Sequence, residues 1–274
     1  MDYKGYKILQ MNENDLALYY EKKILSAPQL NENEYLILTD NTGEAIEYFC
    51  KKEGRLQKLN YPIIKNSFEN SIKPRNIQQY CAIDMLFNPE AKLKILQGVF
   101  GSGKDLLMFN AAIELVEKNK FEKIIFVRPH VTVGGLPDIG FLPGDVHEKL
   151  AWTLAPLFDK AGGEEGINYL ISQNILEMVP MSFIRGRSFT NSIIYMTEGQ
   201  NMTTEIIKLL IGRVGEGSEL WINADTHQSD KRIYNEDNGV SRAIEKLVDN
   251  PLFGYIYLPI TERSEVARLA DLLD

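Results

Sequence analysis

Hydrophobic and polar residues follow two different rhythms along this chain. In the N-terminal part, short β-like runs at Glu34–Leu38 and Ala45–Phe49 flank Asp40-Asn41-Thr42-Gly43, a strong signal for a hairpin turn. The stretch after them is polar and interrupted by prolines, which is typical of a linker. We therefore expect a small β-rich module at 1–60 and a linker at 61–74.

From residue 75 to residue 274, strand-like and helix-like segments alternate. Apolar runs predict strands at 93–96, 123–127, 175–179, 192–196, 219–222 and 255–258. Helical spacing predicts helices near 103–118, 145–160, 203–212, 240–249 and 263–273. The alternation indicates an α/β domain over 75–274. We expect a mainly parallel sheet sandwiched by helices, with ligand bound at the carboxyl ends of its strands.

The residues between the first of these strands and its helix match a phosphate-binding loop up to its last position. Gly98, Val99, Phe100, Gly101, Ser102, Gly103 and Lys104 follow the pattern G-x-x-x-x-G-K. Its glycines let backbone N–H groups turn inward around phosphate oxygens, and its lysine reaches the terminal phosphates. The loop also opens a helix N-terminus, where an anion is stabilised. These residues predict nucleotide binding.

Two departures from the usual motifs concern the metal. The eighth loop position, a Ser or Thr where it holds magnesium, is Asp105. In ATPases of this architecture a strand beside the loop ends in Asp-Glu, the Asp supporting Mg²⁺ and the Glu polarising the attacking water. Here the strand 192–196 ends in Thr197 and Glu198. Because we expect loop and strand to be neighbours, Asp105 and Thr197 should face one Mg²⁺ from opposite sides, with their roles exchanged.

The exchange brings the Asp105 carboxylate close to the phosphates. Two unit charges about 4 Å apart repel by about 4 kcal/mol at an effective dielectric constant of roughly 20. The favourable interaction of a negative charge with the helix N-terminus offsets at most about 2 kcal/mol of this repulsion. The metal must supply the remainder, so we expect nucleotide binding to depend strongly on Mg²⁺. The alternative is a decayed site that binds weakly or does not hydrolyse.

Polar residues at other strand ends extend the candidate site. Gln228 follows the strand 219–222, where a polar side chain can reach the γ-phosphate or the attacking water. Four basic residues lie at strand ends or in loops beside the nucleotide site: Arg128, His130, Arg185 and Arg187. In a ring of subunits they would line a pore and contact nucleic-acid phosphates without sequence preference. Alternatively, Arg185 and Arg187 pair with acidic neighbours such as Glu198 or Asp145.

Composition narrows the function classes. The net charge of −8 argues against a broad electrostatic grip on nucleic acid, so any such contact must come from a local basic groove or pore. No apolar run approaches the roughly 18–20 residues of a membrane span, and the N-terminus does not begin as a secretory signal does. Cys50 and Cys81 suggest neither a disulfide framework nor a metal site. We expect a cytoplasmic protein without membrane contact.

Ordered blocks of sequence resemble the PhoH-like ATPases, the phosphate-starvation-inducible family, from about residue 30 to the end. Besides the phosphate loop, these blocks are Pro74–Gln79, Val127–Pro129, Asp138–Gly144, Phe183–Ser188, Glu198–Asn201, Gly212–Gly217 and Glu262–Ser264. The likeness is greatest to the branch in which a PIN nuclease domain precedes the ATPase. We expect this chain to start after that domain, without the nuclease, and residues 30–60 resemble that branch's connecting β segment.

The resemblance implies a RecA-like P-loop core related to superfamily 1 helicases, with ATP and Mg²⁺ as ligands. It also implies a homo-oligomer, in the form of a hexameric ring, and single-stranded RNA as the polymer. By analogy Asn76 and Gln79 would meet the adenine, and Ser102 and Lys104 would hold phosphates. Glu198 would position water and Gln228 would sense the γ-phosphate. Arg213 and Arg263 would stabilise transition-state charge, from a neighbouring subunit if the ring forms, or else are salt-bridging surface residues.

The family pattern is broken at four positions. Asp105, Thr197, Gly199 and Ala224 stand where Thr, Asp, Ala and Gly are usual, and an extra 135–137 stretch replaces a shorter turn. The first two changes bear on hydrolysis and not on the fold. We weigh three functions: a magnesium-dependent ATPase, helicase-like and stimulated by nucleic acid; a nucleotide-binding switch or scaffold with little hydrolysis; and a small-molecule kinase. The kinase is disfavoured because no acceptor-binding lid is recognisable.

Overall fold

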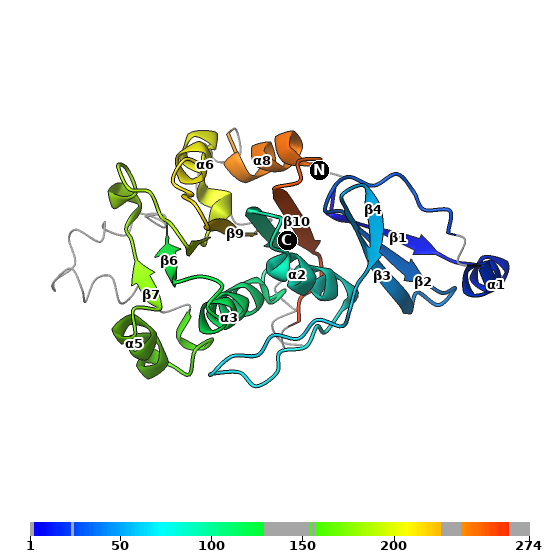
Figure 1. Cartoon of the computed structure of the whole chain (residues 1–274), viewed down its shortest axis with the longest axis horizontal. Coiled ribbons are helices and arrows are strands. Elements are labelled where there is room, and N and C mark those ends of the chain that lie inside the picture. The colour runs from blue at the N-terminus through cyan, green and yellow to red at the C-terminus, as the bar shows by residue number, and fades with distance from the viewer. Residues whose placement is uncertain (1–2, 23–24, 129–153, 155–156, 226–236, 263–274) are drawn as a thin grey trace, which may run out of the picture.

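Two β-sheets organise the molecule. The computed structural model describes residues 3–22, 25–128, 154, 157–225 and 237–262. Within these residues a six-stranded sheet has the order β10-β5-β9-β8-β6-β7, and a four-stranded sheet nearer the N-terminus has the order β1-β2-β3-β4 (Figure 1). The strands of the larger sheet are β5 (Leu93–Gly98), β6 (Lys123–Val127), β7 (Leu176–Met178), β8 (Ser192–Met196), β9 (Glu219–Asp225) and β10 (Phe253–Leu258).

All neighbouring strands of the larger sheet pair in parallel. Such strands are covered on both faces, so their sequences are continuous apolar runs, and all five residues of β8 are buried. The predictions of strands at 123–127 and 192–196 are confirmed residue for residue. The mixed α/β class predicted from the alternation is likewise confirmed.

Helices cover both faces of this sheet (Figure 1). Residues of α2 (Ile77–Phe87), α3 (Lys104–Glu117) and α5 (Glu164–Ser172) share one buried cluster with one face of the strands. Residues of α6 (Thr204–Ile211) and α8 (Gly239–Leu247) share a second cluster with the opposite face. Along β8 the two faces alternate, since Tyr195 belongs to the first cluster and Ile194 to the second. The arrangement is a three-layer sandwich.

One expectation about this sheet is wrong. The strand leading into the phosphate loop, β5, does not lie beside β8, because β9 pairs with both of them. Strand β9 follows both in the chain and inserts between them. Local hydrophobic patterns predict where strands occur but not this spatial order. Residues after β5 and after β8 therefore meet only across the end of β9.

The smaller sheet contains β1 (Tyr6–Gln10), β2 (Tyr35–Thr39), β3 (Ala45–Lys52) and β4 (Arg55–Lys58), with α1 (Glu13–Lys22) beside it. The predicted hairpin joins β2 to β3, and the Asp40 carboxylate accepts hydrogen bonds from the backbone N–H groups of Thr42 and Glu44. Strand β1 pairs in parallel with β2, which the sequence pattern does not predict. Nor does it predict α1, α2 or α5.

The smaller sheet shares its core with the larger domain. The Tyr48 ring stacks on Tyr80 of α2 at a centroid distance of 3.8 Å, and the Tyr35 hydroxyl lies 2.9 Å from the Asp84 carboxylate. The proposed linker at 61–74 runs along α3, where the backbone N–H of Lys65 donates to Glu114 over 2.6 Å. The proposed module and linker therefore pack against the domain that carries the phosphate loop.

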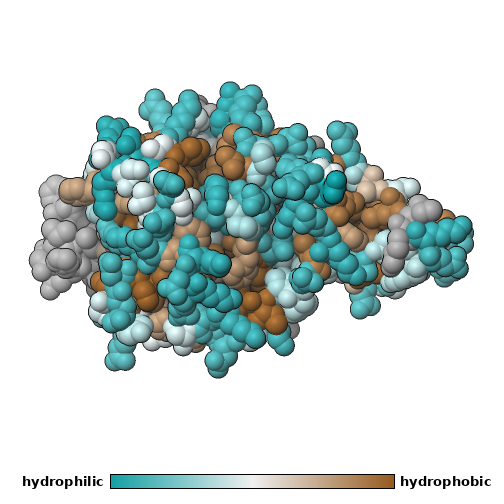
Figure 2. Space-filling view, in the orientation of Figure 1, coloured by the Kyte–Doolittle hydropathy of each residue, from teal (hydrophilic) through white to brown (hydrophobic). Residues whose placement is uncertain are grey.

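The remaining described segments include the short 3₁₀ helices η2 (Met181–Phe183) and η3 (Gly199–Asn201). The helix predicted at 263–273 lies outside the described residues, and the helix at 145–160 lies mostly outside them. Among the helices that are described, none has both the length and the apolar character needed to cross a membrane. Polar side chains cover most of the face seen in Figure 2, interrupted by separate hydrophobic patches.

A buried ion pair ties β5 to β9. The Lys94 ammonium lies 2.7 Å from a Glu219 carboxylate oxygen, and both side chains are almost fully buried. The same oxygen accepts a hydrogen bond from the Trp221 indole, and Lys94 also donates to the backbone carbonyl of Leu86. Burial lowers the pKa of Lys94 to about 8, although the Glu219 charge opposes this effect. The pair sits within the sheet, so breaking it leaves polar groups without partners.

We predict that Glu219→Ala lowers the free energy of unfolding by about 3–5 kcal/mol, because the Lys94 ammonium and the Trp221 N–H lose their buried acceptor. Urea denaturation measures the change. The matched control is Glu245→Ala, whose exposed carboxylate pairs with Arg242 at 3.0 Å and should cost no more than about 0.5 kcal/mol. Equal losses in the two variants would contradict the assignment.

Candidate functional site

The phosphate loop connects the end of β5 to the start of α3. Gly103, the residue before the helix, has φ of 89°, and a Cβ atom there would lie 3.0 Å from Nε2 of Gln79. A Cβ on Gly98 would lie 2.5 Å from the Leu258 carbonyl oxygen of β10. Gly103 needs the left-handed backbone, and both Gly98 and Gly103 need the absence of a side chain. These constraints explain why the motif requires glycine at its two ends.

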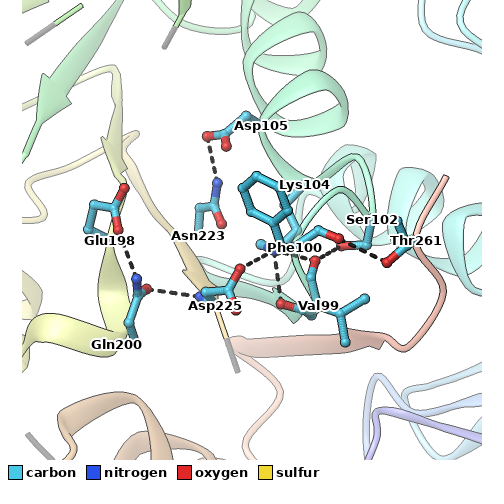
Figure 3. Close-up of polar contacts among 11 residues, drawn as sticks. Val99, Phe100, Ser102, Lys104, Asp105, Glu198, Gln200, Asn223, Asp225 and Thr261 are labelled. Carbon is cyan, nitrogen blue, oxygen red and sulfur yellow. Dashed lines mark hydrogen bonds and ion pairs between the residues drawn. The ribbon is translucent and has the colours of Figure 1, made fainter. Parts of the chain in front are cut away.

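The loop lysine is held inside its own loop. Lys104 Nζ donates to the carbonyl oxygens of Gly98 and Val99 at 2.9 Å each, and lies 3.2 Å from the Asp225 carboxylate (Figure 3). The Lys104 and Asp225 side chains are 8% and 10% exposed. Phosphate oxygens would have to replace these three acceptors. The sequence analysis does not identify Asp225, which ends β9.

Asp105 occupies the first turn of α3 and reaches across β9 to β8. Its Oδ1 accepts hydrogen bonds from the Tyr195 hydroxyl at 2.8 Å and from Asn223 Nδ2 at 2.6 Å. Burial, and after it the Asp105 charge, holds the pKa of Tyr195 well above its ordinary value, so this hydroxyl acts as a donor. Two-residue periodicity places Tyr195 and Thr197 on the same face of the sheet as Asn223.

Glu198, directly after β8, has a backbone conformation that side-chain-bearing residues rarely adopt. Its φ is 58° and its ψ is 37°. Its carboxylate accepts from Gln200 Nε2 at 2.8 Å and lies 3.6 Å from the Arg128 guanidinium. Gln200 in turn accepts from the backbone N–H of Asp225 at 2.9 Å (Figure 3). A polar chain therefore runs from Lys104 through Asp225 and Gln200 to Glu198.

The N-terminus of α2 lies on the other side of the loop. Asn76 caps this helix, its side chain accepting from the backbone N–H of Gln79 and donating to the Glu262 carboxylate at 2.6 Å. Gln79 donates to the Ser102 carbonyl at 3.0 Å and accepts from the Arg75 backbone N–H at 2.9 Å. The Glu262 backbone N–H donates to the Gly101 carbonyl at 3.0 Å. The α2 start, the loop tip and the segment after β10 are thus joined.

One cavity of about 900 Å³ connects these groups. The predicted site residues that line it are Gln79, Phe100, Gly101, Ser102, Gly103, Lys104, Asp105, Thr197 and Glu198. Arg75, Gln200, Asn223, Asp225 and Glu262 line it as well, and the sequence analysis does not identify them as site residues. The spacing of Tyr195 from Thr197, and of Asn223 from Asp225, is the signal that could have found the strand-end residues.

Other predicted residues lie elsewhere. Asn76 does not line the cavity, and neither does Arg213, which donates to the Arg187 carbonyl at 3.3 Å. Arg187 pairs with an acidic side chain, that of Glu177 at 2.8 Å rather than that of Glu198, and its guanidinium stacks over Phe189, while Asp145 lies outside the described residues. Arg185 is exposed. His130, Gln228 and Arg263 lie outside the described residues.

The oxygen-rich set at the deep end of the cavity fits a hard cation. Asp105, Thr197, Asn223 and Asp225 offer carboxylate, hydroxyl and amide oxygens, the ligands that Mg²⁺ prefers. The described residues contain no group of three or more His, Cys, Asp or Glu side chains placed to hold a metal. Mg²⁺ in nucleotide sites needs only one or two carboxylates beside the substrate phosphates, so the residues present fit that ion.

The comparisons agree with the motifs. The family model described as PhoH-like protein matches residues 71–269. Protein PhoH2 of Bacillus subtilis (strain 168) is 31% identical over 99% of this chain and 64% of its own length. Protein PhoH2 of Thermobispora bispora is 29% identical over 97% of this chain and 61% of its own. The chain therefore spans less than two thirds of these relatives. A solved structure of the DnaC helicase loader, 14% identical, covers 69% of this chain and 93% of its own with a TM-score of 0.30, too low to support an argument.

We predict that Glu198→Gly is more stable than Glu198→Ala by about 1 kcal/mol, because glycine adopts the left-handed conformation at residue 198 without steric cost. Chemical denaturation of the two variants measures the difference. The matched control is exposed Lys246, in the last turn of α8, where Gly should instead be less stable than Ala by up to about 1 kcal/mol. The same sign at both positions would show that the backbone at 198 is unstrained.

Proposed function

The chain belongs to the PhoH-like protein family, and we propose that it binds ATP and hydrolyses it in a magnesium-dependent reaction. The observation that carries the proposal is the single cavity that joins the loop lysine, the strand-end glutamate and a set of hard oxygen ligands. A volume of about 900 Å³ lies within the usual range for small-molecule sites. Lys104, Glu198 and the oxygen ligands all line this one cavity.

Phosphate binding falls to the loop and Lys104. The loop's backbone N–H groups and the N-terminus of α3 favour an anion. Lys104 exchanges its hydrogen bonds with the Gly98 and Val99 carbonyls for bonds with phosphate oxygens. Its release from Asp225 leaves that carboxylate beside the terminal phosphates. Phosphate binding is therefore expected to rearrange the deep end of the cavity.

Asp105 and Thr197 are the proposed magnesium ligands. Both line the cavity, and Asp105 keeps its Oδ2 while Oδ1 receives the Tyr195 and Asn223 hydrogen bonds. When bound, Mg²⁺ would supply positive charge that offsets the charge developing on the phosphate oxygens. Strand β9 separates β5, which leads into the loop, from β8, which precedes Thr197. The first turn of α3 nevertheless places Asp105 over β9, toward β8. The exchange of carboxylate and hydroxyl therefore does not require neighbouring strands.

Glu198 is the proposed residue that positions and polarises the attacking water. Its carboxylate is oriented by Gln200 and lies near Arg128. The Arg128 guanidinium helps to orient the carboxylate, which suits a group that must accept a hydrogen bond from water. The αL backbone at Glu198 holds the side chain at the strand end, and strained residues of this kind cluster at functional sites.

We further propose a nucleic-acid role and a ring assembly. Arg128, His130, Arg185 and Arg187 are the proposed contacts to single-stranded RNA. Arg213 does not line the cavity of its own subunit, so any catalytic role for it requires a neighbouring subunit. Arg263 is the alternative for that role.

A nucleotide-dependent switch with little hydrolysis is the second candidate. Lys104 is engaged with Asp225, Asp105 with Tyr195 and Asn223, and Glu198 with Arg128. ATP binding must replace the contact between Lys104 and Asp225, and the neighbouring contacts of Asp105 and Glu198 would adjust to that change. If the binding free energy of ATP drives this rearrangement, the protein would bind ATP and change conformation without fast turnover.

Phosphate release, measured with and without Mg²⁺ and single-stranded RNA, tests the proposal. We expect turnover only with Mg²⁺, an increase on adding RNA, and loss of activity in Lys104→Ala, which also guards against a contaminating ATPase. ATP binding should weaken markedly when Mg²⁺ is chelated. Tight, Mg²⁺-dependent binding without release of phosphate would favour the switch, and equal affinity with and without Mg²⁺ would refute the metal assignment.

The exchange itself is tested by the double reversal Asp105→Thr with Thr197→Asp. We predict that each single change lowers turnover or nucleotide affinity more than the pair does, because residues that share a ligand couple non-additively. The control is Asp105→Asn, which keeps an oxygen for Tyr195 and Asn223 but removes the charge. It should reduce the Mg²⁺ dependence of binding with little loss of stability. Additive effects of the two reversals would contradict a shared ion.

A further inference from the structure

Pro74, Arg75, Gln79 and Glu262 line the same cavity from the N-terminal side of α2 and from the segment after β10. The loop glycines and lysine account for phosphate binding, so a bound nucleotide would need other lining residues to contact its base. Among these four residues, the hydrogen bonds single out Glu262 as the one that can accept a hydrogen bond from the base.

Glu262 is fixed in place from several directions. Its backbone N–H donates to the Gly101 carbonyl at 3.0 Å, and its carbonyl accepts from Arg75 at 3.3 Å. The preceding residue, Thr261, donates to the Phe100 carbonyl at 3.0 Å (Figure 3). Its side chain is held through Oε1, which accepts from Asn76 at 2.6 Å. The carboxylate is thus tied to the loop tip and to the N-terminus of α2.

The acceptor oxygens of the amide side chains nearby are already engaged. The Asn76 side-chain oxygen accepts the N-cap hydrogen bond of α2, and one N–H of its amide donates to Glu262. Gln79 bonds through both its oxygen and its nitrogen, to Arg75 and Ser102. Glu262 Oε2, by contrast, has no hydrogen-bond partner among the described residues. It is an acceptor held at the cavity wall, and an ionised carboxylate cannot act as a donor.

We propose that Glu262 is a base-specificity residue that accepts a hydrogen bond from the exocyclic amino group of a purine. This inference rests on the proposed function and adds the residue that would distinguish ATP, a 6-aminopurine nucleotide, from a 6-oxopurine nucleotide. Adenine presents an N–H donor at this position, whereas guanine and hypoxanthine present a carbonyl acceptor. Two acceptors facing each other leave the carboxylate oxygen unpaired once the base covers it, and selectivity built on such unpaired groups is strong.

Equilibrium competition of ATP and ITP against a fluorescent nucleotide tests the proposal without turnover. The two ligands share their ribose and phosphates and differ at the Watson–Crick edge of the base: adenine has an amino group at C6 and an acceptor at N1, whereas hypoxanthine has a carbonyl at C6 and an N–H at N1. The wild-type protein should bind ATP about tenfold to a hundredfold more tightly, as expected for a hydrogen bond to a charged group. In Glu262→Gln, Oε1 still accepts from Asn76 while the new amide N–H faces the cavity. The ATP to ITP ratio should then fall by about tenfold or invert.

Two further variants separate recognition from general damage. Glu262→Ala should weaken both ligands and bring their ratio close to one. Glu245→Gln, an equivalent change on the exposed face of α8, should keep the wild-type ratio. Equal binding of ATP and ITP by the wild-type protein, or an unchanged ratio in Glu262→Gln, would overturn the assignment while leaving the proposed ATPase intact. Failure to bind either ligand would overturn the proposed function, and this inference with it.

Discussion

The candidate site depends on the docking of the first turn of α3 onto the carboxyl ends of β8 and β9. Lys104 and Asp105 open this helix, and their side chains meet Asp225, Asn223 and Tyr195 from those strands. These contacts join opposite charges and charge-assisted hydrogen bonds in a half-buried space, where such bonds are stronger than in water. They hold the helix N-terminus, and with it the loop's inward-facing N–H groups, over the cavity.

That docking also links the two groups to which the proposed reaction assigns phosphate binding and water activation. The chain from Lys104 through Asp225 and Gln200 to Glu198 consists of adjacent contacts, so a phosphate that displaced Lys104 would perturb the hydrogen-bond partners of Glu198. Coupling of this kind needs a bistable element, and the proposed exchange of Lys104 between Asp225 and phosphate would provide one. A rapid hydrolase and a switch could both use this exchange. They would differ in how much of the binding free energy of ATP the rearrangement requires.

Most of the larger sheet could be predicted from the sequence, because each buried parallel strand is an apolar run that stands out from its surroundings. The phosphate loop was equally visible, since glycine is required by the φ of Gly103 and by the approach of Leu258 to Gly98. The strand order could not be predicted from local patterns, so Asp225 and Asn223 were missed and the neighbour relation was wrong. Glu262 was missed because its role depends on contacts to Asn76 and Gly101, which are distant in sequence.

The four departures from the family pattern form two pairs, and the structure relates the members of each pair. A Cβ atom on Gly199 would lie 3.2 Å from Cβ of Ala224, so these two positions face each other, and the methyl group expected on one is carried by the other. A volume-conserving exchange across a packed contact is the change that a core tolerates best. Asp105 and Thr197 line one cavity, and by the same reasoning their exchange conserves one carboxylate and one hydroxyl there. A cavity that keeps one carboxylate and one hydroxyl beside the loop lysine retains the oxygen ligands that the proposed magnesium site requires.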